Sequence, residues 1–280
     1  MEHSTLSSAD GTKLAIRRWE PADTPRAPIL LVHGLAEHLG RYVHVAEAFT
    51  TAGYDVTGLE LRGHGHSGGK RGHVNRWSDY SDDVRAAAAS IGEPFFLVAH
   101  SMGGLVSLAT LCEPMNPLCR GLVISNPLLG VAVQAPKIKE LGGRLLSRIL
   151  PSLSMTNEIP TEHLSRDPEV VRRYEEDPLV YSTITPRWYT EMLKAQEAVF
   201  AHASAYRLPV LLLVGEADKL CSPEASLRFF DQLGAPDKTL KRYPGYYHEL
   251  FNEPEKAEIL AEVVAWLDQH LGGDDGETAG

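Results

Sequence analysis

Short runs of nearly continuous apolar residues recur along this 280-residue chain and constrain its fold more than any other feature. Strands that are apolar on both faces are typical of a parallel sheet covered by helices on both sides. Helical patterns separate the runs, so the chain is predicted to have an α/β fold with a mostly parallel central sheet. The expected strands are 27–33, 54–60, 94–100, 120–125 and 208–215, and the expected helices are 41–52, 78–91, 102–112, 223–233 and 254–270.

One long interval, 126–207, interrupts this alternation, because it holds helix-like and proline-punctuated pieces but no convincing strand. It is too long for a simple loop between two core strands. Ligands of open α/β sheets bind at the carboxyl ends of the strands, and we expect 126–207 to form a helical cap there. The predicted core is therefore 1–125 with 208–271, and 272–280 is predicted to be a disordered acidic tail. An alternating segment, 12–20, is predicted to be an antiparallel edge strand.

Composition favours a soluble enzyme of the cytoplasm. The net charge is −10, from 27 basic and 37 acidic side chains, which argues against nucleic acid as a partner. Three cysteines provide no disulfide framework, as expected in a reducing compartment. The amino terminus lacks the basic and apolar regions of a secretory signal, and no apolar run approaches the roughly 18–20 residues of a membrane span.

The stretch 97–104, "LVAHSMGG", joins an expected strand to an expected helix and places Ser101 at the junction. A serine nucleophile on such a turn needs small neighbours two positions before and two positions after it. Ala99 and Gly103 meet this demand, although Ala99 replaces the usual glycine. Ser101 is therefore the candidate nucleophile.

A serine hydroxyl needs a histidine base and an acid that orients the histidine. In this strand order the acid and then the histidine are expected after later strands. Asp218 follows the strand 208–215, and His248 follows the short strand expected at 238–243. Glu216 is the alternative acid. The oxyanion is expected to bind the backbone amide of Met102, the residue after the nucleophile, and that of Leu35, in the loop after the strand 27–33, where Gly34 allows a tight turn.

Five stretches together resemble the monoacylglycerol lipase and lysophospholipase branch of the α/β-hydrolase superfamily, the group of serine aminopeptidase S33-type hydrolases. They are "HGLAEHLGRY" (33–42), "LRGHGHSGG" (61–69), "AHSMGG" (99–104), "GEADKLCSP" (215–223) and "YHELFNE" (247–253). The resemblance implies an α/β-hydrolase fold, a triad of Ser101, Asp218 and His248, and a lid that admits an acyl chain. The chain departs from the family pattern at Ala99 and at Glu60, where the family has glycine and aspartate.

Other polar residues near these motifs are predicted to shape the pocket. His33, Gly34 and His100 are the expected substrate-binding residues. His64, His66 and His73 suggest a metal site, but no carboxylate or thiolate accompanies them at suitable spacing. We therefore expect neither a metal nor an organic cofactor.

The predicted function is that of a serine carboxylic-ester hydrolase, releasing a fatty acid from a monoacylglycerol or lysolipid through an acyl-enzyme on Ser101. The alternatives are a proline iminopeptidase-like enzyme, a thioesterase and a short-chain carboxylesterase. An aminopeptidase would need acidic groups in the cap, for which Glu158, Glu162 and Glu169 are available. A non-catalytic ligand receptor on the same fold is the alternative from another class.

The cap segment 136–150 combines apolar residues at helical spacing with lysines and arginines on another side. Such a helix can lie on an anionic membrane surface, which would make the enzyme peripheral at a membrane. The other interpretation is an ordinary cap helix with its apolar stripe packed inward. Small-molecule lipid or ester substrates are the only other partners that the sequence predicts.

Overall fold

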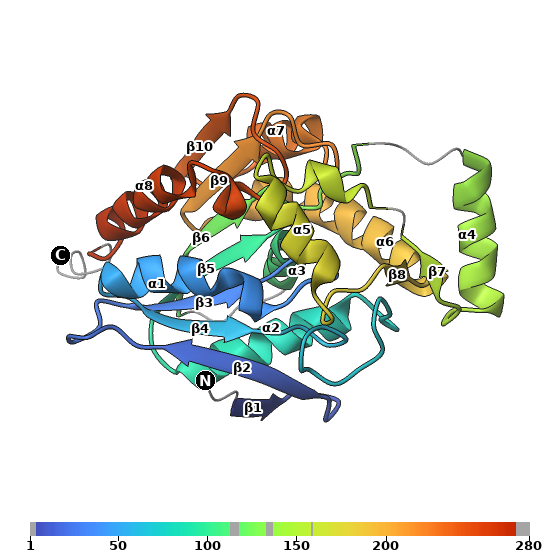
Figure 1. Ribbon diagram of the computed structural model, residues 1–280, viewed down its shortest axis with the longest axis horizontal. Coiled ribbons are helices and arrows are strands. Elements are labelled where there is room, and N and C mark those ends of the chain that lie inside the picture. The colour runs from blue at the N-terminus through green and yellow to red at the C-terminus, as the bar shows by residue number, and fades with distance from the viewer. Residues whose placement is uncertain (1–3, 113–117, 133–136, 158, 273–280) are drawn as a thin grey trace.

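The computed structural model describes residues 4–112, 118–132, 137–157 and 159–272 and arranges them around an eight-stranded sheet (Figure 1). The strand order is β1-β2-β4-β3-β5-β6-β9-β10. Strand β2 pairs antiparallel with β1 and β4, and the other pairings are parallel, which confirms the predicted fold class. The strands are β1 (Ser4–Ser7), β2 (Lys13–Trp19), β3 (Pro28–Val32), β4 (Asp55–Leu59), β5 (Phe95–His100), β6 (Cys119–Ser125), β9 (Val210–Gly215) and β10 (Lys238–Tyr243).

Strand β2 occupies the segment predicted to be an edge strand, but it is not the edge of the sheet. Strand β1 pairs along its outer side, with Ser4 opposite Ile16. The sequence "STLS" of β1 is polar and mostly exposed, so it carries no apolar pattern from which a strand could be predicted. The prediction that 12–20 forms the edge strand was therefore wrong, because β1 is the edge and β2 is its neighbour.

Helices cover both faces of the sheet, as the apolar strands require. Neighbouring residues of β3 point to opposite layers: Leu30 packs in the core beneath one set of helices, and Leu31 in the core beneath the other. Both side chains are fully buried, each contributing about 1.5–3 kcal/mol of hydrophobic free energy. The first layer is formed by α2 (Ser78–Ile91), α3 (Met102–Leu111) and α7 (Pro223–Gln232), and the second by α1 (Val43–Thr51) and α8 (Lys256–Gln269).

A long segment between β6 and β9 lies beyond the carboxyl ends of the parallel strands (Figure 1). We call this segment, from residue 126 to 207, the cap. It contains two short paired strands in addition to helices, although no strand was predicted there. Its elements are α4 (Lys137–Ile149), β7 (Met155–Thr156), η2 (Thr161–His163), α5 (Pro168–Glu176), β8 (Thr183–Ile184), α6 (Pro186–His202) and η3 (Ala203–Ala205).

Two remaining short helices, η1 (Leu39–Tyr42) and η4 (Leu250–Asn252), belong to the core.

The predicted acidic tail lies outside the described residues from residue 273 on. Among the described helices, none has both the length and the apolarity to cross a bilayer.

A buried arginine ties the amino-terminal hairpin to the rest of the core. The Arg62 guanidinium donates to both carboxylate oxygens of Asp83 on α2, at 2.7–3.1 Å. It also donates to Asp10 at 2.8 Å and to the Ser8 hydroxyl at 3.0 Å. Asp83 is fully buried, so its charge depends on this pairing.

Replacing Asp83 with alanine is expected to lower the free energy of unfolding by about 3 kcal/mol, because it leaves a buried guanidinium without its main partner. Urea denaturation followed by circular dichroism measures the change. Asp82→Ala is the matched control, since Asp82 is one-third exposed on the same helix and pairs with Arg85. Its loss should stay below about 1 kcal/mol. Equal losses in the two variants would contradict the role assigned to Asp83.

Candidate active site

Ser101 occupies a strained turn between β5 and α3. Its φ is +51° and its ψ is −118°, a combination that an ordinary side chain rarely adopts. The Ser101 amide donates to the Ser125 carbonyl at 3.0 Å, which fixes the turn beside β6. Two residues later the helix passes so close to β3 that a Cβ on Gly103 would lie 2.4 Å from the His33 carbonyl oxygen. Only glycine fits at Gly103, as the sequence pattern requires.

Ala99 fits the position where glycine is more usual. It is fully buried within β5, in register with Val32 on one side and Ile124 on the other. The methyl group therefore occupies an ordinary inward-facing place in the sheet. Alanine in place of glycine at position 99 therefore leaves the position of Ser101 unchanged.

The structure brings Ser101, His248 and Asp218 into one hydrogen-bonded chain. His248 Nε2 lies 3.0 Å from Ser101 Oγ, and His248 Nδ1 lies 2.7 Å from Asp218 Oδ2. All three side chains are buried. Burial lowers the pKa of His248, but the Asp218 carboxylate, with Glu249 and Glu37 beyond it, outweighs burial and raises the pKa above 6.5. This geometry is that of a serine nucleophile with its base and orienting acid.

Backbone amides hold Asp218 in place. Asp218 Oδ1 accepts from the Leu220 and Cys221 amides at 2.8 and 3.0 Å, which leaves Oδ2 for the histidine. The alternative acid, Glu216, forms an ion pair with Arg242 at 2.6 Å instead. The geometry therefore favours Asp218 over Glu216.

Asn126, which the sequence analysis did not single out, connects the loops that carry the acid and the base. Its side-chain oxygen accepts from the Gly215 amide at 2.8 Å, just before the loop of Asp218. Its side-chain nitrogen donates to the Tyr247 and His248 carbonyls at 3.1 and 2.6 Å. The one available signal was its position, a polar residue directly after a buried strand at the carboxyl edge of the sheet.

The loop after β3 forms the other wall beside Ser101. Its Gly34 amide donates to Glu37 Oε1 at 2.6 Å, and Ala36 has a φ of +62°, so the loop is tightly folded. This fold brings Leu35 to the cavity wall. Met102 is the first residue of α3, where backbone amides have no partner within the helix. Leu35 and Met102 thus both lie near Ser101, and the binding of the oxyanion by their amides stays a prediction.

The predicted substrate-binding residues lie in different places. Gly34 and His100 line the cavity, whereas His33 is fully buried behind it. His33 Nδ1 donates to the Gly34 carbonyl at 2.7 Å, and its Nε2 accepts from the Leu61 amide at 3.1 Å. His33 therefore shapes the loop and is in no position to touch a substrate.

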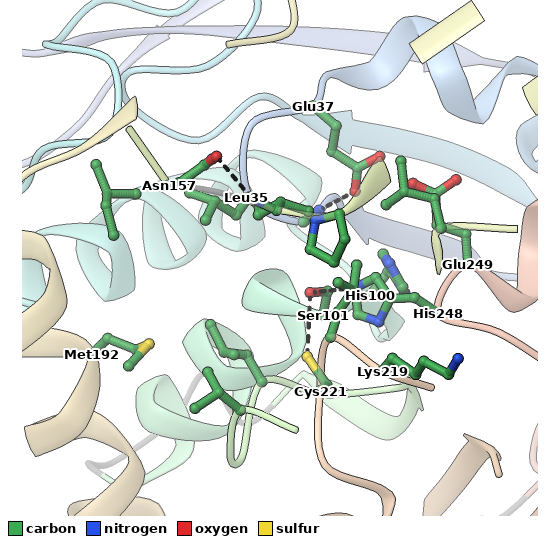
Figure 2. Close-up of a pocket in the computed structure, with 18 of the residues that line it drawn as sticks. Leu35, Glu37, His100, Ser101, Asn157, Met192, Lys219, Cys221, His248 and Glu249 are labelled. Atoms are coloured by element: carbon green, nitrogen blue, oxygen red, sulfur yellow. Dashed lines mark hydrogen bonds between the residues drawn. The ribbon is translucent and has the colours of Figure 1, made fainter. Parts of the chain in front are cut away.

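A cavity of about 410 Å³ opens above Ser101 and is mainly apolar. This volume suits a small-molecule ligand. Figure 2 shows Met192 on one side of Ser101, with His248, Glu249 and Lys219 on the other. The apolar lining comes mostly from the cap, including Ile159, Leu164, Ile184, Trp188, Tyr189 and Met192.

Glu37, Arg41 and Glu249 form a buried ionic cluster at one side of this cavity. Arg41 donates to Glu37 at 2.8 Å and to both oxygens of Glu249 at 2.6 and 2.7 Å. Burial raises the pKa of Glu37, but Arg41, His100, His33 and the Tyr42 hydroxyl together outweigh burial and hold the pKa at about 2. The sequence analysis quoted the motif of Glu37 and Arg41 but assigned these residues no role.

His100 packs directly beside the base, with its ring centroid 4.7 Å from that of His248. Burial, together with the nearby His248, lowers the pKa of His100 to about 4. His100 is therefore neutral at physiological pH. It adds bulk to the wall without competing with His248 for protons.

Two of the three histidines that suggested a metal site, His64 and His73, hold the cap to the core. The His64 ring lies 2.6 Å from the Tyr181 hydroxyl, and the His73 ring lies 2.9 Å from that of Thr185. Burial lowers the pKa of His64 to about 3, so this ring is neutral. The partner residues belong to the stretch that leads from α5 into α6.

Asp218, Cys221 and His248 are a group of described residues whose donor atoms could hold a metal ion, since these atoms lie within 4.8 Å of one another. Two of the three are already hydrogen bonded to each other as base and acid. The third, the Cys221 thiol, lies 3.8 Å from Ser101 Oγ, and burial raises its pKa well above the usual value. Because His248 is hydrogen bonded to both Asp218 and Ser101, the group fits the base and acid of a hydrolase site.

Comparison with known proteins agrees with this geometry. Residues 23–255 match the family model described as serine aminopeptidase, S33. The chain is 33% identical to the monoacylglycerol lipase of Mycolicibacterium smegmatis over 276 residues, covering 96% of this chain and 98% of that protein. It is 32% identical to the phospholipase YtpA of Bacillus subtilis over 254 residues, covering 89% and 98%.

A solved structure is similar as well. The crystal structure of Paleococcus ferrophilus monoacylglycerol lipase superimposes with a TM-score of 0.85 at 36% identity, covering 92% of this chain and 99% of that one. The matches span both the core and the cap. The chain belongs to the serine aminopeptidase S33 family of α/β-hydrolases and is a monoacylglycerol lipase-like serine hydrolase.

Proposed function

We propose that this protein hydrolyses monoacylglycerols, with Ser101 as nucleophile, His248 as general base and acid, and Asp218 as the orienting acid. The observation that carries the proposal is the hydrogen-bonded chain of these three residues, at 3.0 and 2.7 Å, beneath a mainly apolar cavity. The monoacylglycerol lipases among its relatives support the same substrate class.

In the proposed reaction Ser101 Oγ attacks the ester carbonyl while His248 Nε2 takes its proton. The Leu35 and Met102 amides bind the oxyanion, an effect worth roughly 3–4 kcal/mol per donor. His248 then protonates the departing glycerol, and Asp218 stabilises the charged imidazole. Finally His248 activates a water molecule, which releases the fatty acid from Ser101.

An aminopeptidase has weaker support. Such an enzyme would need a carboxylate that faces the substrate amine from the cap. Glu169 is partly exposed and paired with Arg172 and Arg173, and Glu162 is exposed. Glu158 lies outside the described residues. The cap residues that line the cavity are mainly apolar, which suits an acyl chain.

We further propose that the cap contacts membranes through the outer face of α4 and the segment that follows it, up to Met155. Leu145, Ile149, Leu150, Leu153 and Met155 are large apolar residues exposed by 45–64%. Arg144 and Arg148 are exposed beside them.

Helix α4 packs on α6 through Ser147, whose hydroxyl lies 2.8 Å from that of Thr190. On the same side Gly143 faces the ring of Tyr189, which lines the cavity. The five exposed apolar residues therefore face away from the core. Exposed apolar and basic side chains on one helix are typical of binding to an anionic bilayer surface.

Fatty-acid release from monoacylglycerols of increasing chain length tests the proposed reaction. We expect release that rises toward long chains and that Ser101→Ala abolishes, together with labelling by a fluorophosphonate probe. Ser125→Ala is the matched control, because Ser125 is buried on the neighbouring strand and its hydroxyl has no partner. Undiminished labelling of the Ser101 variant would refute the assignment, and refusal of long chains would favour a short-chain esterase.

The pH dependence of kcat/KM tests the role of His248. Because the pKa of His248 is raised and the neutral ring is the base, activity should be lost as pH falls through a value above 6.5. Glu249→Gln removes one of the carboxylates that raise this pKa, so the acid limb should move to lower pH. Glu216→Gln, which changes a partly exposed carboxylate paired with Arg242, should leave the limb in place. An unmoved limb in the Glu249 variant would contradict this electrostatic picture.

Vesicle sedimentation tests the membrane contact. The double variant Leu145→Glu with Ile149→Glu should bind vesicles of phosphatidylcholine and phosphatidylglycerol at least tenfold more weakly than the wild type. Arg173→Gln on α5, which also removes an exposed basic residue, should bind normally. Equal binding by all three proteins would place the contact elsewhere.

A further inference from the structure

The cavity has two chemically different halves around Ser101. Met192 lies on the apolar side, and Glu249 and Lys219 lie on the side of His248 (Figure 2). In the reaction proposed above, His248 Nε2 protonates the leaving alcohol, so that alcohol must lie on its side of the nucleophile. The inference that follows rests on that proposed function. It concerns which alcohols this half of the cavity accepts.

The wall of this half is acidic. Glu37 and Glu249 both line the cavity, whereas Arg41, which pairs with both, lies behind them. Two carboxylates share one guanidinium, so the cluster carries a formal charge of −1. Both carboxylates are nearly fully buried, at 3% and 4% exposure, so water and salt screen this charge weakly.

Among the described residues that line the cavity, Lys219 is the only lysine or arginine. It does not offset the negative charge of the cluster. Its side chain is exposed, and Figure 2 shows it extending away from Ser101. Surrounding water screens an exposed ammonium. When His248 is protonated and ready to protonate the alcohol, its charge offsets that of the adjacent Asp218. The net charge of the buried groups beside the leaving alcohol is then that of the cluster.

Carboxylate oxygens are acceptors only, and each has two lone pairs. Glu249 Oε1 accepts one hydrogen bond, from Arg41, and Glu249 Oε2 accepts two, from Arg41 and Asn252. A hydroxyl group of a neutral polyol can donate to the remaining lone pair of Oε1. A phosphate monoester offers mainly acceptors and a negative charge, and both oppose such a wall.

We propose that Glu249, together with Glu37, is a charge filter that selects neutral leaving alcohols, such as glycerol, and rejects alcohols that carry a phosphate next to the ester. Discrimination of this kind works through repulsion of the wrong substrate and not only through attraction of the right one. The protein would then act on neutral monoacylglycerols and poorly on anionic lysophospholipids. Glu249 is a specificity-determining residue in this scheme, and the triad performs the chemistry.

Two water-soluble substrates with the same acyl chain test the filter, namely monooctanoylglycerol and octanoylglycerol 3-phosphate. Both are used as monomers at a pH on the plateau of the measured kcat/KM profile, so neither aggregation nor protonation of the base differs between them. We expect the wild type to prefer the neutral substrate at least 100-fold in kcat/KM. Glu249→Gln changes the formal charge of the cluster from −1 to 0 and should reduce this preference at least tenfold, mainly by raising kcat/KM for the phosphate.

Three controls separate the filter from structural effects. Glu253→Gln removes a buried carboxylate on the same loop that pairs with Arg166 and does not line the cavity, so the preference should persist. Glu249→Asp keeps the charge and should retain more of the preference than Glu249→Gln. Raising sodium chloride from 0.05 to 0.5 M should change the wild-type preference less than threefold, whereas repulsion by the overall charge of −10 would fade with salt.

The outcomes are distinct. Equal hydrolysis of both substrates by the wild type would overturn the filter and leave the proposed function standing. Equal effects of the Glu249→Gln and Glu253→Gln substitutions would also overturn it, because the effect would then belong to the loop as a whole. Failure to hydrolyse either substrate, with no fluorophosphonate labelling, would overturn the proposed function and the filter together.

Discussion

The site depends on one strained residue, Ser101, held with a φ of +51° between a buried strand and a helix. Such a conformation costs of order 1–3 kcal/mol and persists only where the surrounding structure overdetermines it. Here the constraint comes from both sides. The amide of Ser101 is bound to the Ser125 carbonyl, and Gly103 lets the helix approach the His33 carbonyl. The serine hydroxyl is thereby presented at the edge of the sheet, where the loops after later strands can reach it.

The two parts of the cap are attached differently: the stretch from α5 to α6 is hydrogen bonded to the core, whereas α4 packs on α6. The stretch from α5 to α6 is held by partly buried polar contacts: His38 lies 2.9 Å from Asp177, and His64 lies 2.6 Å from Tyr181. Helix α4 instead stands at the outer margin of the cap and packs on α6 (Figure 1). A firmly attached α5–α6 stretch keeps the acyl-side lining in place, and α4 remains available for a contact outside the protein.

The sequence predicted those features that local patterns encode. Strand runs, the small residues around Ser101 and the positions of Asp218 and His248 after strands are all local, and parallel strands bring such positions to one edge of the sheet. Contacts between residues far apart along the chain were out of reach. Asn126 holds Gly215 and Tyr247, and Arg41 binds a carboxylate 208 residues away. No local pattern signals these partners, and the same holds for the inward burial of His33 and for the polar strand β1.

The buried ionic cluster illustrates why such distant contacts are more than packing. Burying three charges is expensive, and well-packed apolar residues could fill the same space at lower cost. The cluster instead connects two loops that carry groups of the proposed reaction. Glu37 fixes the Gly34 amide and hence the loop of Leu35, whereas Glu249 lies next to His248 on another loop. Because Arg41 binds both carboxylates, the proposed oxyanion loop cannot shift against the proposed base without breaking a desolvated ion pair. Apolar residues could fill the same volume, but they could not fix the position of the loop of Leu35 relative to His248.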